Sequence, residues 1–301
     1  MNINDYEWIA QECPICETPP TLFLGRRGGN AHRSGLGIEC EIWQCGNCRL
    51  IFPNPMPVPA RGLGQHYEVS GDEYFQHHEL EEKREAAREQ LRQAATLQPK
   101  GGRLLDIGAG RGEFVSVAKE EGWEPVGIEP SESFASFAEN LAGVPMYRTE
   151  LRDCNFPGSS FDVVILGAVL EHLYNPDETV KEIARILKRG GLLFVDVPNE
   201  EGLYFRVGNL YQKIRGREWV VNLAPTFSPF HVFGYGTKSL RALLAKYELS
   251  PRIWHVYGGT SYVPTRAGLI GEFEKIGAKA VTAISNLGQL GTYIETWAVK
   301  T

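Results

Sequence analysis

The sequence predicts an α/β fold built on a largely parallel sheet, preceded by a small module that a metal ion holds together. One observation is a short apolar run, Arg103–Ile107, that leads into the glycine turn G-A-G-R-G and then into an amphipathic segment ended by Gly122. A second is that further short apolar runs alternate with helical patterns toward the end of the chain. The third is a pair of C-x-x-C motifs near the start.

Composition and charge narrow the class of protein. The 301 residues are 43% hydrophobic and 23% charged, which suits a globular chain with one large domain and a smaller one. The net charge of −6 disfavours a protein whose main task is to hold a phosphate backbone. No run of eighteen apolar residues predicts a membrane span, and the start M-N-I-N-D-Y-E-W does not resemble a signal peptide. We therefore expect a cytoplasmic protein without a membrane partner.

The two C-x-x-C motifs, C-P-I-C and C-G-N-C, predict a structural zinc site. Two residues between cysteines let both thiolates point at one tetrahedral ion from a single turn. Reduced surface pairs or a redox dithiol are the alternatives. Cys40 and Cys154 are expected to be packed and inert. The expected zinc ligands are Cys13, Cys16, Cys45 and Cys48.

We expect residues 1–58 to form this zinc-ribbon-like module. Its four arginines face six acidic residues, so its net charge of −2 favours a scaffold or substrate-gating role over RNA binding. Pro53–Pro59 is expected to be a stiff connector, because alternating prolines favour an extended backbone. Residues 59–100 then form a connecting unit that carries a helix from about Gln76 to Leu97.

The glycine turn indicates close approach of a ligand to the backbone, since glycine has no Cβ. No Gly-Lys-Ser/Thr follows, so the turn is not a P-loop. A second predicted strand, Glu124–Ile128, ends at Glu129, which lies 23 residues beyond Asp106 and is placed to accept hydrogen bonds from ribose hydroxyls. A doubly wound domain that binds NAD, or binds nothing, is the alternative.

Four segments carry a family resemblance: L-L-D-I-G-A-G-R-G-E-F, V-G-I-E-P-S, F-D-V-V-I-L-G-A-V-L-E-H-L and L-K-R-G-G-L-L-F-V-D-V-P. In this order they resemble class I S-adenosylmethionine-dependent methyltransferases, over about two thirds of the chain. The resemblance implies a Rossmann-like domain at 101–301, with a seven-stranded sheet whose last strand is antiparallel. The later strands are expected at about Val144–Arg148, Phe161–Leu166, Leu192–Val197, Arg252–Tyr257 and Thr292–Val299. A further helix is expected at about Arg266–Ser285.

The resemblance also implies cofactor contacts. Asp106 would orient the glycine loop and face the methionine amino group, and Glu150 would approach the adenine amino group. An aromatic residue, Tyr67 or Tyr74, would cover the methionine end, although both tyrosines could simply pack. The expected cofactor residues are Asp106, Gly108, Ala109, Gly110, Glu129, Pro130, Glu150, Leu151, Leu166 and Tyr74.

The binding site for the methyl acceptor is predicted to lie in residues 199–236. This stretch is aromatic-rich and irregular, which is typical of a substrate lid. His231 could take a proton from a hydroxyl as the methyl group arrives. His172, next to Glu171, is a second candidate for acid or base catalysis. The alternatives are that His231 is packed among aromatic side chains and that the Glu171-His172 pair serves the cofactor side.

Together these features predict an enzyme that transfers a methyl group from S-adenosylmethionine, leaving S-adenosylhomocysteine. The expected acceptor is a small molecule, such as a sugar, a nucleotide-linked metabolite or a biosynthetic intermediate, with O-methylation favoured. A tRNA or rRNA methyltransferase that uses the zinc module to hold RNA is one alternative. A non-catalytic protein that keeps the fold is another.

Overall fold

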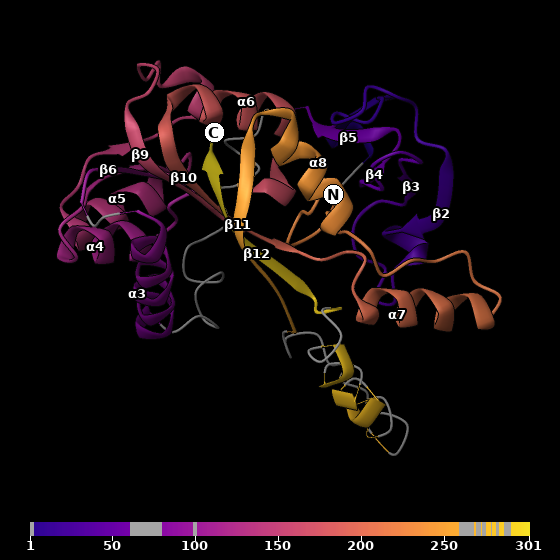
Figure 1. The fold of residues 1–301 in the computed structure, drawn as a ribbon. Helices are drawn as coiled ribbons and strands as arrows, with labels where there is room; N and C mark the ends of the chain where they lie inside the picture. Colours follow the sequence, from indigo (N-terminus) through magenta and orange to yellow (C-terminus); the bar gives the residue numbers. More distant parts are fainter. Residues whose placement is uncertain are drawn as a thin grey trace.

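The structure, a computed structural model, describes residues 3–60, 80–98, 101–258 and 290–301, together with positions 268, 272, 275–277, 279–280 and 283–285. A seven-stranded sheet runs through the larger part of the molecule (Figure 1), in the order β11-β12-β10-β9-β6-β7-β8. Its strands are β6 Arg103–Ile107, β7 Glu124–Ile128, β8 Met146–Tyr147, β9 Phe161–Gly167, β10 Leu187–Pro198, β11 Leu249–Tyr257 and β12 Tyr293–Lys300. β12 is antiparallel to both of its neighbours, which confirms the predicted α/β class and the antiparallel last strand.

Helices cover both faces of this sheet, which explains why its central strands β6 and β9 carry apolar side chains on both faces. Leu104 of β6 packs in one cluster with α3, whereas the next residue, Leu105, packs in another with α6 and α8. Figure 1 shows α3, α4 and α5 on the side of the sheet opposite α6 and α8. The helices are α3 Leu80–Leu97, α4 Glu113–Glu120, α5 Glu132–Ala142, α6 Pro176–Ile186, α7 Leu203–Ile214 and α8 Thr237–Lys246. Short 3-10 turns lie at η1 Ile3–Asp5, η2 Gly29–Ala31, η3 Leu151–Asp153 and η4 Leu170–His172.

Some predicted boundaries are wrong. β10 begins at Leu187 rather than Leu192, because Leu187 already pairs with Phe161 before the register shifts. α6 ends at Ile186, and Gly190 lies within β10. The stretch 199–236 is not irregular throughout, since it contains α7.

The N-terminal part forms two small sheets. One contains β2 Leu22–Arg27, β3 Cys40–Gln44 and β4 Ile51–Pro53, and the other pairs β1 Tyr6–Ile9 with β5 Met56–Pro59. The second half of the predicted proline connector is thus strand β5, with Pro57 opposite Trp8 and Pro59 opposite Tyr6. Proline is tolerated there because a two-stranded ribbon has outer edges whose N–H groups need no partner.

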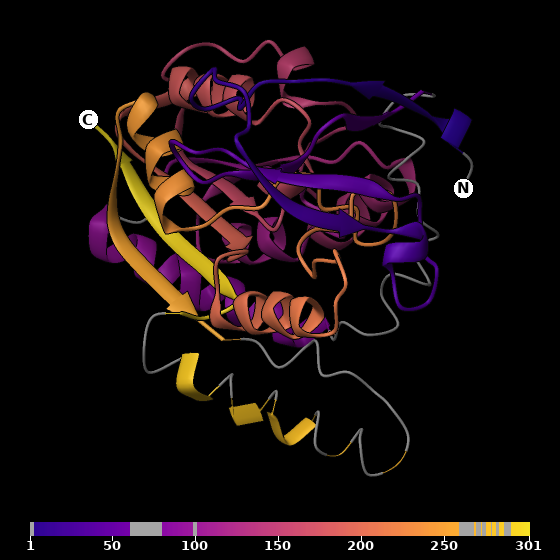
Figure 2. The same ribbon diagram turned by 90° about the vertical axis from the view of Figure 1, so that its right-hand side faces the viewer.

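This N-terminal part packs tightly on the larger domain (Figure 2). Ile51 and Gly234 exchange two backbone hydrogen bonds of 3.0 and 2.7 Å, and the rings of Phe52 and Phe233 lie 5.9 Å apart. Cys13, Cys45 and Cys48 share one apolar core with the sheet. The predicted boundary at residue 58 falls inside β5, and the division of the chain into three units stays a prediction.

Three predictions fall outside the described residues: the roles of Tyr67 and Tyr74, the start of the helix predicted from Gln76, and most of the helix predicted at 266–285. Among the residues that the structure describes, no helix combines the length and the apolarity needed to cross a membrane.

Candidate functional site

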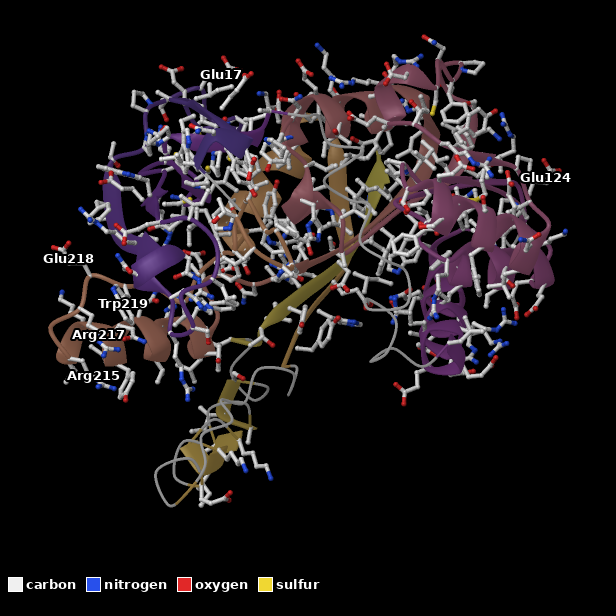
Figure 3. The ribbon with its side chains drawn as sticks, turned by 180° about the vertical axis from the view of Figure 1, so that it is seen from behind. Glu17, Glu124, Arg215, Arg217, Glu218 and Trp219 are labelled. Atoms are coloured by element: carbon white, nitrogen blue, oxygen red, sulfur yellow. The ribbon has the colours of Figure 1, made fainter. Side chains whose placement is uncertain are left out.

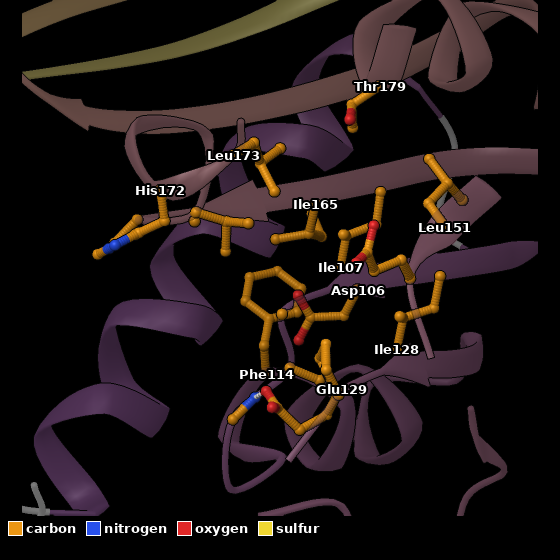
Figure 4. Close-up of a pocket in the computed structure, with 18 of the residues that line it drawn as sticks. Asp106, Ile107, Phe114, Ile128, Glu129, Leu151, Ile165, His172, Leu173 and Thr179 are labelled. Atoms are coloured by element: carbon orange, nitrogen blue, oxygen red, sulfur yellow. Dashed lines mark hydrogen bonds between the residues drawn. The ribbon is translucent and has the colours of Figure 1, made fainter. Parts of the chain in front are cut away.

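A cavity of about 660 Å³ opens at the carboxyl ends of β6, β7, β9 and β10. This is the edge of an open α/β sheet at which ligands are generally bound. Figure 4 shows the acidic side chains of Asp106 and Glu129 on one side of the cavity and His172 on another, with apolar side chains between them. Segments far apart in the sequence meet here, including Glu150–Asp153 and Ser228–Phe230.

The glycine turn shapes one wall of the cavity. Gly108 has φ of +71°, and a Cβ there would lie 2.5 Å from Val169 Cγ2, so the turn packs directly on the segment after β9. Gly110 has φ of +54°, and a Cβ there would meet no atom within 4 Å. The backbone at Gly110 is therefore bare toward the cavity, which allows a ligand to approach it closely.

Glu129 ties this turn to the end of β7. Its Oε2 accepts a hydrogen bond from Gly110 N at 2.9 Å, and its Oε1 accepts one from Ser131 N at 2.9 Å. Burial raises the pKa of Glu129, while these two backbone donors act in the opposite direction. A carboxylate has lone pairs beyond these two bonds, so Glu129 can still accept hydrogen bonds from ligand hydroxyls.

Asp106 is buried deeper, at the end of β6. Burial raises its pKa well above the usual value, and the nearby carboxyls of Glu113 and Glu129 raise it further. No cation among the described residues is paired with Asp106. A positively charged ligand group next to Asp106 would favour the ionised form.

Most of the other predicted cofactor residues line the cavity: Gly108, Ala109, Gly110, Pro130, Glu150 and Leu151. Glu150 lies at the rim, where its carboxylate is 3.2 Å from Arg152 Nε. Leu166 does not line the cavity. Its side chain is fully buried in the core, because neighbouring residues of a strand point to opposite faces and Ile165 and Gly167 take the cavity side.

Sequence reasoning missed Asp196, which lines the cavity from β10. Burial raises its pKa to about 7, with a further contribution from Glu295, and Tyr257 Oη donates a hydrogen bond to it at 3.2 Å. The available signal was a single acidic residue inside the apolar run L-L-F-V-D-V. Phe114 and Ile128 were also missed, and they supply apolar wall on either side of the two buried carboxyls (Figure 4).

Glu171, His172 and His231 form a cluster beside the cavity. Glu171 Oε1 lies 3.9 Å from His172 Nε2 and 3.8 Å from His231 Nε2, and the two imidazole rings meet edge to face at 4.8 Å. Burial raises the pKa of Glu171 to about 8 and lowers the pKa of His231 to about 3. Only His172 lines the cavity, so the three side chains form a layered arrangement with His172 outermost.

The segment around His231 is fixed to this cluster by its backbone. Val232 N and Phe233 N donate to the carbonyl oxygen of Glu171 at 2.9 and 3.1 Å. His172 Nδ1 lies 3.3 Å from the carbonyl oxygen of Phe230, which favours the tautomer with its proton on Nδ1. Ser228, Pro229 and Phe230 line the cavity, whereas α7 of the predicted lid does not.

The four predicted zinc ligands come together in the N-terminal part. The Sγ atoms of Cys13, Cys16, Cys45 and Cys48 all lie within 4.8 Å of one another. The two turns have the same geometry: Glu17 N donates to Cys13 O and Arg49 N to Cys45 O, and both Glu17 and Arg49 have positive φ. Four thiolates within reach of one point suit a structural tetrahedral ion.

Cys40 and Cys154 stand apart from this group. Cys40 is buried in β3, and burial raises its pKa to about 12. Cys154 is partly buried, and burial raises its pKa to about 11. Thiols that ionise so reluctantly are poor nucleophiles.

The sheet order, the glycine turn and the paired acidic residues define a Rossmann-like fold of the S-adenosylmethionine-dependent methyltransferase class. A family model described as a methyltransferase domain matches residues 75–256, and the chain therefore belongs to that family. A structure of an S-adenosylmethionine-dependent methyltransferase from Methanosarcina mazei is 18% identical, with a TM-score of 0.50, over 69% of this chain and 96% of that one. At this identity the likeness concerns the fold.

Two curated relatives cover shorter stretches. An uncharacterized protein of Methanocaldococcus jannaschii is 30% identical over 115 residues, 38% of this chain and 52% of that protein. A ubiquinone biosynthesis O-methyltransferase of Coxiella burnetii is 29% identical over 140 residues, 45% of this chain and 57% of that protein. The chain thus spans somewhat more than half the length of these relatives.

Proposed function

We propose that this protein transfers a methyl group from S-adenosylmethionine to a hydroxyl of a small-molecule acceptor. The observation that carries the proposal is the placement of His172 in the same cavity as Asp106, Glu129 and the bare backbone of Gly110. The residues proposed to bind the cofactor and the proposed proton acceptor thus line the same cavity. The name of the Coxiella relative, an O-methyltransferase, supports the same type of acceptor atom.

The residues present fit the cofactor. Glu129 would accept hydrogen bonds from the ribose hydroxyls, and Asp106 would balance the methionine amino group. Glu150 and Leu151 would border the adenine, with Ala109 and Pro130 nearby. When bound, S-adenosylmethionine supplies an activated methyl group on a sulfonium, so the protein's contribution is to position and desolvate the acceptor.

His172 is the candidate base. With its proton on Nδ1, facing the carbonyl oxygen of Phe230, its Nε2 can accept a proton from an acceptor hydroxyl. Glu171 Oε1 lies 3.9 Å from this Nε2, and an imidazolium formed there would favour the ionised form of the Glu171 carboxyl. His231 lies behind Glu171, so we assign it a positioning role rather than direct contact with the acceptor.

We further propose that Cys13, Cys16, Cys45 and Cys48 bind one structural Zn²⁺. The ion would hold the two cysteine turns together next to β4. Ile51 and Phe52 of β4 contact the segment that follows His231. The zinc module would in this way support the acceptor side of the cavity without supplying a reactive group.

Incubation with methyl-labelled S-adenosylmethionine tests the function. Panels of phenols, sugars, nucleotide-linked metabolites and total tRNA are offered, and labelled products are identified by mass spectrometry. The proposal expects label on a small-molecule oxygen. Label on tRNA, or on nitrogen or carbon alone, would contradict it.

Replacement of the candidate base gives the accompanying prediction. His172→Ala should lower kcat about 10²- to 10⁴-fold, the usual contribution of a general base, while the cofactor Kd stays within a few-fold. His231→Ala should have a smaller effect on kcat. Equal loss of kcat and of cofactor affinity in His172→Ala would show that this residue serves the cofactor side instead.

A further inference from the structure

The helix α7 is turned with its apolar side away from the protein. Its large apolar side chains recur at spacings of three and four residues and so form one stripe along the helix. Val207 is 42% exposed, Leu210 57%, Tyr211 44% and Ile214 76%. No residue of the helix is buried.

The polar and small residues of α7 face the protein. Asn209 Oδ1 accepts a hydrogen bond from Val221 N at 2.9 Å, and Asn209 Nδ2 donates one to Asn222 Oδ1 at 2.6 Å. A Cβ on Gly208 would lie 2.8 Å from Val221 Cγ2. A helix that stabilises its own fold buries its apolar face. α7 does the reverse, because its apolar stripe is exposed.

Basic side chains accompany the stripe. From residue 203 to 217 the sequence contains Arg206, Lys213, Arg215 and Arg217 and no acidic residue, although the whole chain carries a net charge of −6. Figure 3 shows Arg215, Arg217 and Trp219 gathered at one end of α7. The Arg217 guanidinium lies 4.4 Å from the centre of the Trp219 ring. Tryptophan, tyrosine and arginine beside an apolar stripe are typical of the boundary between water and lipid.

The apolar surface continues beyond the helix. A groove of about 320 Å³ lies between α7 and β2, with Leu210, Trp219 and Phe23 in its walls. Leu22 and Phe23 of β2 are 50% and 36% exposed. Figure 1 shows α7 at the periphery of the molecule.

We propose that α7 and the adjoining β2 edge bind the surface of an anionic phospholipid bilayer, with the helix parallel to it. A helix of 12 residues is about 18 Å long, too short to span a bilayer but suited to lie in its interface. Its basic residues complement anionic headgroups. A second copy of the chain would present the same positive charges, which opposes self-association through this face.

Vesicle flotation of the intact protein tests this proposal. Phosphatidylcholine vesicles are compared with vesicles in which part of the lipid is phosphatidylglycerol. The protein should float with the anionic vesicles, and added salt should weaken the binding. Leu210→Glu with Ile214→Glu should weaken it at least tenfold. Lys213→Glu and Arg217→Glu should each weaken it about fivefold or more.

Ile9→Glu is the matched control, because Ile9 is 46% exposed on β1 and does not belong to the apolar stripe of α7. Circular dichroism and cofactor binding establish that each variant is folded. Absence of flotation with the wild-type chain would overturn the proposal. A loss in Ile9→Glu equal to that in the double variant would do the same, as would a wild-type dimer in light scattering that Ile214→Glu dissociates.

Discussion

Glu129 has two tasks that a single substitution can probe. It accepts hydrogen bonds from the N–H groups of Gly110 and Ser131, and its carboxylate also faces the cavity. Glu129→Ala should weaken S-adenosylhomocysteine binding roughly ten- to a hundredfold, since hydrogen bonds to a charged group contribute about 1.5–3 kcal/mol. Isothermal titration calorimetry measures the change.

Glu124→Gln is the control for this substitution, because Glu124 is exposed at the start of the same strand. Glu124→Gln should bind S-adenosylhomocysteine with the affinity of the wild type. Unchanged affinity in Glu129→Ala would show that the carboxylate only supports the loop.

The pH dependence of the free energy of unfolding should reveal the raised pKa of Glu171. Its folded pKa of about 8 lies above the ordinary value of 4.5, so the folded protein keeps a proton that the unfolded chain releases between these values. The stability that this carboxyl contributes is complete below about pH 4.5 and is lost as the pH rises toward 8. Glu171→Gln cannot lose its proton, so relative to wild type it should gain stability from pH 5 to pH 9, by up to about 4 kcal/mol.

Urea unfolding of both proteins at several pH values measures this difference. The comparison cancels the titration of all other groups. A stability difference that does not change with pH would place the pKa of Glu171 near its ordinary value and remove the reason to treat its carboxyl as protonated at neutral pH.

At the scale of the element, three glycines that flank α4 allow the effect on stability to be separated from the effect on cofactor binding: Gly110 and Gly112 precede the helix and Gly122 follows it. Gly110, Gly112 and Gly122 all have positive φ, so alanine at each carries a similar backbone cost of about 1 kcal/mol. A Cβ at Gly112 would lie 2.7 Å from Ala138 Cβ, whereas a Cβ at Gly110 or Gly122 meets nothing within 4 Å.

Gly112→Ala should therefore lower the melting temperature clearly more than Gly122→Ala, because α4 and α5 must move apart. Gly110→Ala should match Gly122→Ala in stability but lose cofactor affinity, because its methyl group enters the cavity. Differential scanning fluorimetry and calorimetric titration give the two readouts. Intact affinity in Gly110→Ala would exclude close approach of the ligand to this backbone.

The two cysteine turns belong to the same apolar core as the sheet. Loss of the metal should therefore lower the stability of the whole molecule and not only of its N-terminal part. Cys45→Ser should lose the bound zinc and lower the melting temperature, because a closed tetrahedral site contributes directly to folding. Cys154→Ser, which removes a partly buried thiol outside the cluster, should keep one zinc per chain. Elemental analysis and thermal unfolding measure both effects. Zinc retained at full stoichiometry in Cys45→Ser would contradict the ligand assignment.

At the scale of the whole molecule, local patterns predicted most of the framework. The strand, glycine turn and helix at 103–120 are encoded by neighbouring residues, and so are the two C-x-x-C turns. Contacts between segments that are distant in the sequence could not be predicted from local patterns. The approach of Phe230 to His172, 58 residues away, depends on how the loop folds over the sheet. Leu166 lies outside the cavity because the alternation of side chains along β9 turns Ile165 and Gly167 to that side.

The orientation of α7 could not be predicted either. Its apolar spacing is visible in the sequence, but the same spacing normally means burial. Only the fold shows that Asn209 takes the inward side and Ile214 the outward one.

The central claim is that the cavity at the end of the sheet is a site for S-adenosylmethionine. Calorimetric titration of S-adenosylmethionine and S-adenosylhomocysteine into the purified wild-type protein, with zinc quantified on the same sample, tests it most directly. We expect one site with a dissociation constant in the micromolar range for both ligands. Absence of heat and of thermal stabilisation with either ligand, in folded protein that contains zinc, would contradict the account.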